Sequence, residues 1–183
     1  NLFDRWIFVL AFDEKEEMTD SKMREEARKA ANSFHAHIKG HEIESATVVD
    51  LIERPDLAVA FAEGLALSSY KFDKYLTKDK KEKKKKVELT KISIKSDFIS
   101  EENIGQLQAV AEAVYHTRDL VNEPLSYLTA EQLAGEIKKM GKDAGFKVQV
   151  WNKKKIESEK MGGLLAVNRG SIDPPTFSIL EYK

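Results

Sequence analysis

The first half of the chain alternates between continuous apolar runs and stretches with apolar residues at helical spacing. Residues 6–12 are almost wholly apolar, which predicts a strand buried on both faces, as in a parallel sheet. Thr19 begins an amphipathic stretch that predicts a helix ending near Gly40. Residues 46–51 predict a second strand, and Pro55 suits the first turn of a second helix. This alternation indicates α/β layering with a mainly parallel sheet.

A long helical pattern follows and stops at a proline. Ser100 is an N-cap residue type, and the apolar stripe after it continues to Val121. Pro124 disfavours helical geometry in the residue before it, so we expect this helix to end near Asn122. The stripe consists of Ile104, Leu107, Val110, Ala111, Val114 and Val121. The corner at Pro124 therefore indicates a junction between two domains.

Beyond this corner the pattern is again typical of α/β structure. Thr129 and Gln132 form a capping box, which predicts that a helix begins at Thr129. Leu133 belongs to the apolar face of that helix, and Gly145 suits the C-cap. The remaining predictions are a bulged strand over 87–94, strands over 146–151, 164–168 and 176–182, a short helix or turn over 156–160, and a turn at Gly162-Gly163.

Composition narrows the class of protein. The 183 residues are 42% hydrophobic and 33% charged with a net charge of -1, which disfavours a protein that coats nucleic acid. The absence of cysteine excludes disulfides and thiolate chemistry and is compatible with a reducing cytoplasm. We expect neither a membrane span nor a signal peptide. The chain opens and stops beside predicted strands, so we expect it to be part of a longer protein.

The most biased segment is Lys78–Lys86, in which seven of nine residues are lysine. Such a run is typical of a solvated loop held open by repulsion between like charges. It also suits contact with nucleic-acid phosphates. We favour the solvated loop, because no aromatic residues are interleaved with the lysines and the rest of the chain is not basic.

Three segments together resemble one family. Residues 118–124 read Arg-Asp-Leu-Val-Asn-Glu-Pro and are followed by Leu128-Thr129. Residues 70–75 read Tyr-Lys-Phe-Asp-Lys-Tyr, and residues 161–171 read Met-Gly-Gly-Leu-Leu-Ala-Val-Asn-Arg-Gly-Ser. In this order and spacing they are similar to the leucine aminopeptidase family, also called cytosol aminopeptidases, which are dinuclear-metal exopeptidases.

The resemblance implies an organisation and a function. It predicts a macro-like N-terminal α/β domain over 1–99, a linking helix over 100–122, and the first helix and strands of a catalytic α/β domain over 123–183. The complete protein would be a cytoplasmic homo-hexamer that removes N-terminal amino acids from peptides with a free N-terminus. It would use two divalent metal ions, zinc or manganese, to polarise the scissile carbonyl and activate a bridging water.

The family's metal ligands lie in two stretches that this sequence lacks. One is Gly-Lys-Gly running into Thr-Phe-Asp-Ser-Gly-Gly, and the other is Asn-Thr-Asp-Ala-Glu-Gly-Arg; in the family both follow the point where this chain stops. We therefore assign no catalytic, cofactor-binding or metal-ligating residue, and we expect the 183 residues alone to be inactive. The carboxylates of Asp119, Glu123 and Asp173 stand in no ligand motif, and Asp119 and Arg169 are interpreted as structural.

Weaker signals leave alternatives open. His35, His37 and His41 with Glu42 suggest a metal cluster, but Gly40 interrupts the shared helix face, so we interpret them as exposed histidines. Ser68, Ser69 and Ser171 have no base nearby in the sequence. The alternative functions are a non-catalytic assembly module and a nucleic-acid-binding domain that uses the lysine loop. Sequence beyond Lys183 would test the first, and a salt-dependent gel shift the second.

Overall fold

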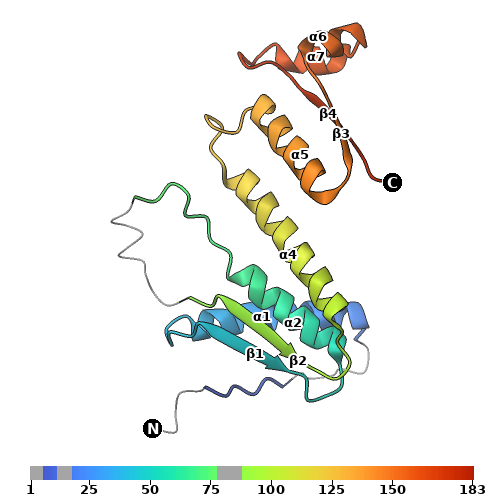
Figure 1. Cartoon of the computed structure of the whole chain (residues 1–183). Helices are drawn as coiled ribbons and strands as arrows, with labels where there is room; N and C mark the ends of the chain where they lie inside the picture. The colour runs from blue at the N-terminus through green and yellow to red at the C-terminus, as the bar shows by residue number, and fades with distance from the viewer. Residues whose placement is uncertain (1–5, 12–17, 78–87) are drawn as a thin grey trace. The chain divides into compact units, whose positions relative to one another are not determined.

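The computed structural model describes residues 6–11, 18–77 and 88–183, and it divides into two compact units, residues 1–118 and 119–183 (Figure 1). Both units combine helices and strands, so the predicted α/β class is confirmed. In the described part of the chain no helix is long and apolar enough to cross a bilayer.

The first unit is built on a parallel pair of strands. Its elements are α1 (Asp20–Ile38), β1 (Ser45–Val49), α2 (Pro55–Ser68), β2 (Lys91–Lys95) and the first part of α4 (Glu101–Asn122). β1 and β2 pair in parallel, in a register that runs from Ser45 opposite Lys91 to Val49 opposite Lys95. The parallel pairing agrees with the prediction, and α2 packs against both strands.

The core of this unit lies between α1 and α2, with one face of the strands packed on it. Gly64 on α2 sits against the backbone of α1, because a Cβ built there would lie 2.6 Å from the carbonyl oxygen of Arg28. A glycine therefore lets the two helix backbones approach closely. The buried side chains of this cluster are Ala27, Ala31, Leu57, Ala60, Phe61 and Leu65.

The predicted helix starts are confirmed by their caps. The hydroxyl of Thr19 accepts a hydrogen bond from the Lys22 amide, and Pro55 occupies the first turn of α2. At the start of α4, the Ser100 hydroxyl accepts from the Asn103 amide at 3.3 Å. These contacts satisfy amide groups that have no partner within the helix.

The second unit contains the end of α4, then α5 (Ala130–Ala144), β3 (Lys147–Trp151), α6 (Lys153–Ser158), α7 (Gly162–Asn168) and β4 (Phe177–Glu181). β3 and β4 are antiparallel, with Lys147 opposite Glu181 and Trp151 opposite Phe177. The capping box of Thr129 and Gln132 is present, and Gly145 closes α5 in the left-handed conformation at φ 77°. Both features agree with the sequence prediction.

Three strand predictions are wrong or too long. Residues 164–168 form α7 instead of a strand, and Gly162-Gly163 begins that helix instead of forming a turn before a strand. A short apolar run does not by itself distinguish a strand from a helix. Residues 6–11 form no strand: in the described part of the chain β1 and β2 pair only with each other, and a strand needs a partner. The strand predicted over 87–94 is β2 and begins at Lys91; residue 87 lies outside the described ranges.

Leu133, on the predicted apolar face of α5, remains partly exposed. Its side chain is 37% exposed, whereas the neighbouring Ala134 is 4% exposed. The buried face of α5 includes Gly141, where an added Cβ would lie 2.4 Å from a methyl carbon of Val148 on β3. The buried face of α5 thus consists of small residues. A search of the sequence for large apolar side chains at helical spacing does not identify them.

Candidate functional site

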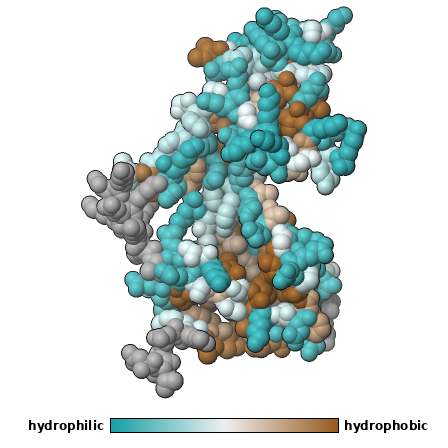
Figure 2. All heavy atoms as spheres, viewed as in Figure 1, coloured by the Kyte–Doolittle hydropathy of each residue, from teal (hydrophilic) through white to brown (hydrophobic). Residues whose placement is uncertain are grey.

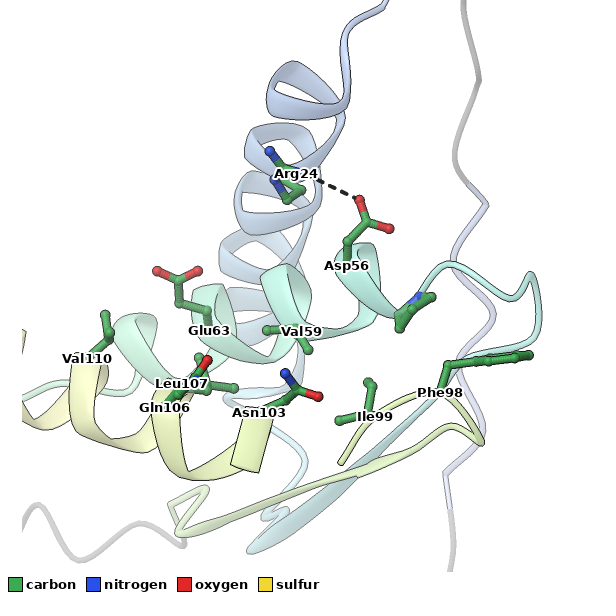
Figure 3. Close-up of a pocket in the computed structure, with 11 residues that line it drawn as sticks. Arg24, Asp56, Val59, Glu63, Phe98, Ile99, Asn103, Gln106, Leu107 and Val110 are labelled. Carbon is green, nitrogen blue, oxygen red and sulfur yellow. Dashed lines mark ion pairs between the residues drawn. The ribbon is translucent and has the colours of Figure 1, made fainter. Parts of the chain in front are cut away.

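A pocket of about 480 Å³ lies in the first unit, between α2 and the first half of α4 (Figure 3). Pro55 at the start of α2 and Phe98, which follows β2, both border it. The pocket therefore lies beside the carboxyl ends of the two parallel strands. Open α/β sheets commonly bind ligands at this edge.

The wall formed by α1 and α2 carries paired charges. Arg54 contacts both carboxylate oxygens of Asp56, at 3.0 and 3.1 Å, and also reaches Asp20 at 3.1 Å. Arg24 lies 3.6 Å from Asp56. The hydrogen bonds from Arg54 lower the pKa of Asp56 most, partial burial opposes that shift, and the charges of Arg54 and Arg24 add to the lowering. Asp56 is thus held as a carboxylate.

The second carboxylate of this wall is Glu63. Arg28 donates to it from Nε at 2.8 Å, and the Glu63 side chain is 18% exposed. On the opposite side, α4 contributes Asn103, Gln106, Leu107 and Val110 (Figure 3). The pocket therefore combines a charged wall with an aliphatic floor.

The C-terminal half of α4 is fixed to the end of α2. The Tyr115 hydroxyl donates to the carbonyl of Ala66, and Arg118 donates to the carbonyl of Leu67 at 2.7 Å. The guanidinium of Arg118 also lies 5.4 Å from the ring centroid of Tyr70. These donors satisfy carbonyls in the last turn of α2, where a cation also interacts favourably with the helix dipole. Sequence analysis assigned no such role to Tyr115 or Tyr70.

Among the described residues, two buried nitrogen atoms have no hydrogen-bond partner. They are Nε2 of His116 on α4 and Nε1 of Trp151 on β3. The Trp151 ring packs 5.5 Å from the ring of Phe177, its partner on β4, and Lys155 lies 5.5 Å from its centroid. No sequence motif pointed to either atom.

The histidines do not form a metal site of three ligands. His37 lies on α1 and His41 in the turn after it, with ring centroids 5.7 Å apart, and Trp6 packs 4.7 Å from His41. His35 has a lowered pKa, first because of burial and then because of Lys39 and Lys71. No group of three or more His, Asp or Glu side chains suited to a metal occurs in residues 6–11, 18–77 and 88–183.

The three serines considered from the sequence make hydrogen bonds to the backbone. Ser68 and Ser69 donate to carbonyls one turn earlier on α2, at 2.6 and 2.9 Å. Ser171 accepts from the Asp173 amide at 3.1 Å. None of these three side chains shows a hydrogen bond to a basic side chain, so the described contacts do not activate a nucleophile.

The remaining residues considered from the sequence lie near the ends of helices. Asp119 and Glu123 lie at the end of α4, where the Glu123 amide donates to the Asp119 carbonyl at 3.0 Å. Asn168 donates to the Asp173 carbonyl at 3.0 Å, and Arg169 is the exposed C-cap of α7. Glu42 takes a positive φ of 51° in the turn after α1. The segment Lys78–Lys86 lies outside the described residues.

Two family models match the chain in order. The N-terminal domain of the cytosol aminopeptidase family matches residues 5–79, and the catalytic domain of the same family matches residues 115–183. The chain belongs to the cytosol aminopeptidase family. This confirms the resemblance found in the three sequence segments.

Curated relatives agree with this assignment. A probable cytosol aminopeptidase of Clostridium perfringens is 33% identical over 183 residues, covering 96% of this chain and 36% of the relative. One of Chlorobium phaeobacteroides is 44% identical over 134 residues, covering 69% of this chain and 27% of the relative. The chain thus spans about a third of the length of these relatives or less.

Solved structures share the fold. The bottromycin maturation enzyme BotP is 25% identical with a TM-score of 0.72, over 87% of this chain and 34% of BotP. BotP in complex with Mn is 24% identical with a TM-score of 0.69, over 91% of this chain and 34% of that one. A tomato leucine aminopeptidase mutant is 24% identical with a TM-score of 0.71, over 90% and 34% of the two chains.

Proposed function

We propose that the complete protein is a metal-dependent aminopeptidase of the leucyl type, which removes N-terminal amino acids from peptides. The observation that carries this proposal is the presence of both family domains, in order, within one chain. The Clostridium perfringens relative, named a probable cytosol aminopeptidase, aligns with 96% of this chain. Peptides with a free N-terminus are the corresponding substrates.

The domain organisation that we propose follows the sequence prediction. Residues 1–99 form a macro-like N-terminal domain, residues 100–122 the linking helix, and residues 123–183 the beginning of the catalytic domain. The matched ranges 5–79 and 115–183 support an N-terminal and a catalytic part. Neither range covers residues 80–114, which include β2 and the first part of α4.

The metal pair does not fit the described residues of this segment. None of the described His, Asp and Glu side chains come together in a group of three, whereas a dinuclear site needs several ligands around two cations. BotP has been solved in complex with Mn, which supports a metal cofactor in the complete protein. The family resemblance implies that this metal is zinc or manganese. We assign its ligands to the part of the catalytic domain that the relatives have and these 183 residues do not include.

We also propose that the complete protein is a cytoplasmic homo-hexamer. Support for the compartment comes from the relatives, which are named cytosol aminopeptidases. The hexamer follows from the family resemblance, with the N-terminal domain supporting assembly and access to the active site. Size-exclusion chromatography with light scattering on the complete protein would check the number of subunits.

The proposed activity is tested with a chimera. The 183 residues are fused to the remaining catalytic part of the Clostridium perfringens relative, and hydrolysis of a leucyl amide is measured with added manganese or zinc. We expect chelator-sensitive turnover from the chimera and none from the 183 residues alone. The matched control is the relative itself.

Two results would contradict the proposal. Turnover by the short chain at a rate near that of the chimera would show that the segment carries catalytic residues. An inactive but folded, metal-loaded chimera, beside an active relative, would show that this segment cannot serve an aminopeptidase.

A further inference from the structure

We propose that His37 and His41 together bind one divalent transition-metal ion of the nickel, copper and zinc class. Two imidazoles supply the protein ligands, and water completes the coordination. The site lies at the C-terminal end of α1 and is separate from the metal pair of the proposed aminopeptidase. The inference does not rest on the proposed function, because it needs only residues of the first unit.

The turn after α1 brings the two rings together. The C-cap residue Lys39 keeps right-handed helical geometry, at φ -58° and ψ -18°. The His41 amide then donates to the Ile38 carbonyl at 2.9 Å. The chain thus turns once more, and His41 stays beside His37 although Gly40 lies between them. Their ring centroids are 5.7 Å apart.

This separation suits two ligands of one ion. A metal–nitrogen bond of about 2.0–2.1 Å places an ion about 3 Å from the centroid of each ligating ring. A tetrahedral angle between the ligands then separates the two centroids by about 5 Å, and a wider angle by up to about 6 Å. The observed 5.7 Å between His37 and His41 lies in this range. Small rotations of the two side chains therefore suffice to hold an ion.

Both imidazoles have nitrogen atoms open to a metal. Their described contacts are with other rings: His37 meets the edge of Phe8 at 6.1 Å, and His41 packs 4.7 Å from Trp6. Among the described residues, no hydrogen bond uses an imidazole nitrogen of His37 or His41. His37 is exposed and His41 half-buried, so an ion in solution can reach them.

The charges around the pair favour a cation. The last carbonyls of a helix carry partial negative charge, and the pair lies at that end of α1. Glu42 and Glu44 follow in the sequence, against the one cation Lys39. His35 on the same helix differs, because Lys39 and Lys71 both act on it and it has no histidine ring against its own. His35 is therefore a suitable control.

The segment at residues 6–11 places a fluorescent reporter beside the pair. Figure 2 shows apolar surface along the lower edge of the first unit, where this segment runs. Phe8 anchors the segment on α1, with its ring 5.0 Å from that of Phe34. The Trp6 ring, 62% exposed, lies against His41. An ion held by His41 would therefore lie close to an indole.

The first experiment follows quenching of Trp6 fluorescence as NiCl₂ is added to the 183-residue chain. The sequence has two tryptophans, so Trp151→Phe leaves Trp6 as the only one. We expect saturable quenching with one ion per chain, because Ni²⁺ has an open d shell and quenches at short range. Zn²⁺, whose d shell is filled, should displace Ni²⁺ and restore the fluorescence. Mg²⁺ should not, because it prefers oxygen ligands.

The second experiment uses variants of the pair. His37→Gln removes one ligand at an exposed position, and His41→Phe removes the other while it keeps a ring against Trp6. Each should weaken Ni²⁺ binding by about tenfold or more, because a two-point chelate becomes a single contact. His35→Gln should leave the affinity unchanged. Zn²⁺ should also raise the melting temperature of the wild type and of His35→Gln, but not that of the other two variants.

Four results would overturn the proposal. These are the absence of saturable quenching, displacement of Ni²⁺ by Mg²⁺ as readily as by Zn²⁺, a loss of affinity in only one variant of the pair, and an equal loss in His35→Gln. A loss in one variant alone would mean adsorption to a single exposed histidine. None of these measurements uses peptidase activity, so their failure is distinct from failure of the proposed function.

Discussion

Arg118 on α4 donates a hydrogen bond to the main-chain carbonyl of Leu67, at 2.7 Å, near the end of α2. The two residues are 51 positions apart in the chain. The contact places a fixed positive charge at the C-terminal end of a helix, where the dipole is negative. It also satisfies a carbonyl that has no partner within α2.

We predict that Arg118→Met lowers the free energy of unfolding by about 1–2 kcal/mol. Loss of a hydrogen bond from a charged donor costs more than loss of a neutral one, and partial exposure reduces that cost. Urea unfolding followed by far-UV circular dichroism measures the change. Arg169→Met, at an exposed position on α7, is the control and should change stability by no more than about 0.5 kcal/mol. Equal effects of the two substitutions would contradict a role for Arg118 at the end of α2.

Tyr115 gives the chain a predictable response to alkaline pH. Burial raises its pKa above the ordinary value of 10.0, and Arg118 opposes that shift. The folded chain therefore holds the phenolic proton more tightly than the unfolded chain. The stabilisation is fully present below the unfolded pKa and is lost as the pH rises through the folded pKa. Ionisation also removes the donor to the Ala66 carbonyl.

The measurement compares the wild-type chain with Tyr115→Phe across pH. We expect the wild type to be more stable by about 0.5–1.5 kcal/mol near neutral pH. This advantage should shrink as the pH rises above about 10, because only the wild type loses the Tyr115 proton there. The other tyrosines contribute equally to both chains and cancel. A difference that stays constant or grows with pH would show that the neutral phenol does not stabilise the fold.

Substitutions at Gly64 and Gly105 provide a matched test of helix packing in the first unit. An added Cβ at Gly64 would lie 2.6 Å from the Arg28 carbonyl oxygen and 2.7 Å from its Cα, whereas nothing lies within 4 Å of a Cβ at Gly105. We predict that Gly64→Ala destabilises the chain by about 1–3 kcal/mol through overpacking. Gly105→Ala, on the exposed face of α4, should instead stabilise it by up to about 1 kcal/mol. Thermal melts of both variants check the opposite signs.

Local signals were predictable from the sequence, and long-range packing was not. The caps at Thr19, Ser100 and Thr129 depend on residues within three positions, so their residue types suffice. The helix α7 was missed because a four-residue apolar run fits either secondary structure until its neighbours are known. The buried residues of α5 are Ala134 and Gly141, which a stripe of large apolar side chains does not identify.

The pocket also illustrates this limit. Its residues come from α1, α2, α4 and the segment after β2, and Arg24 and Val110 are far apart in the sequence. No motif links them, so only the three-dimensional arrangement brings them together. The family resemblance, by contrast, was carried by contiguous segments and was recognisable without a structure.

After the corner at Pro124, the capping box of Thr129 and Gln132 begins α5. The Thr129 hydroxyl accepts from the Gln132 amide, and the Gln132 side chain accepts from the Thr129 amide at 2.9 Å. Thr129→Ala removes the cap oxygen and should lower the free energy of unfolding by about 1 kcal/mol. Thr117→Ala is the control, because the Thr117 hydroxyl donates to the Ala113 carbonyl within α4 and alanine is a better helix former. We expect that control to be neutral or slightly stabilising in thermal melts. A Thr129→Ala melt that coincides with the wild type would mean that the capping box does not stabilise the start of α5.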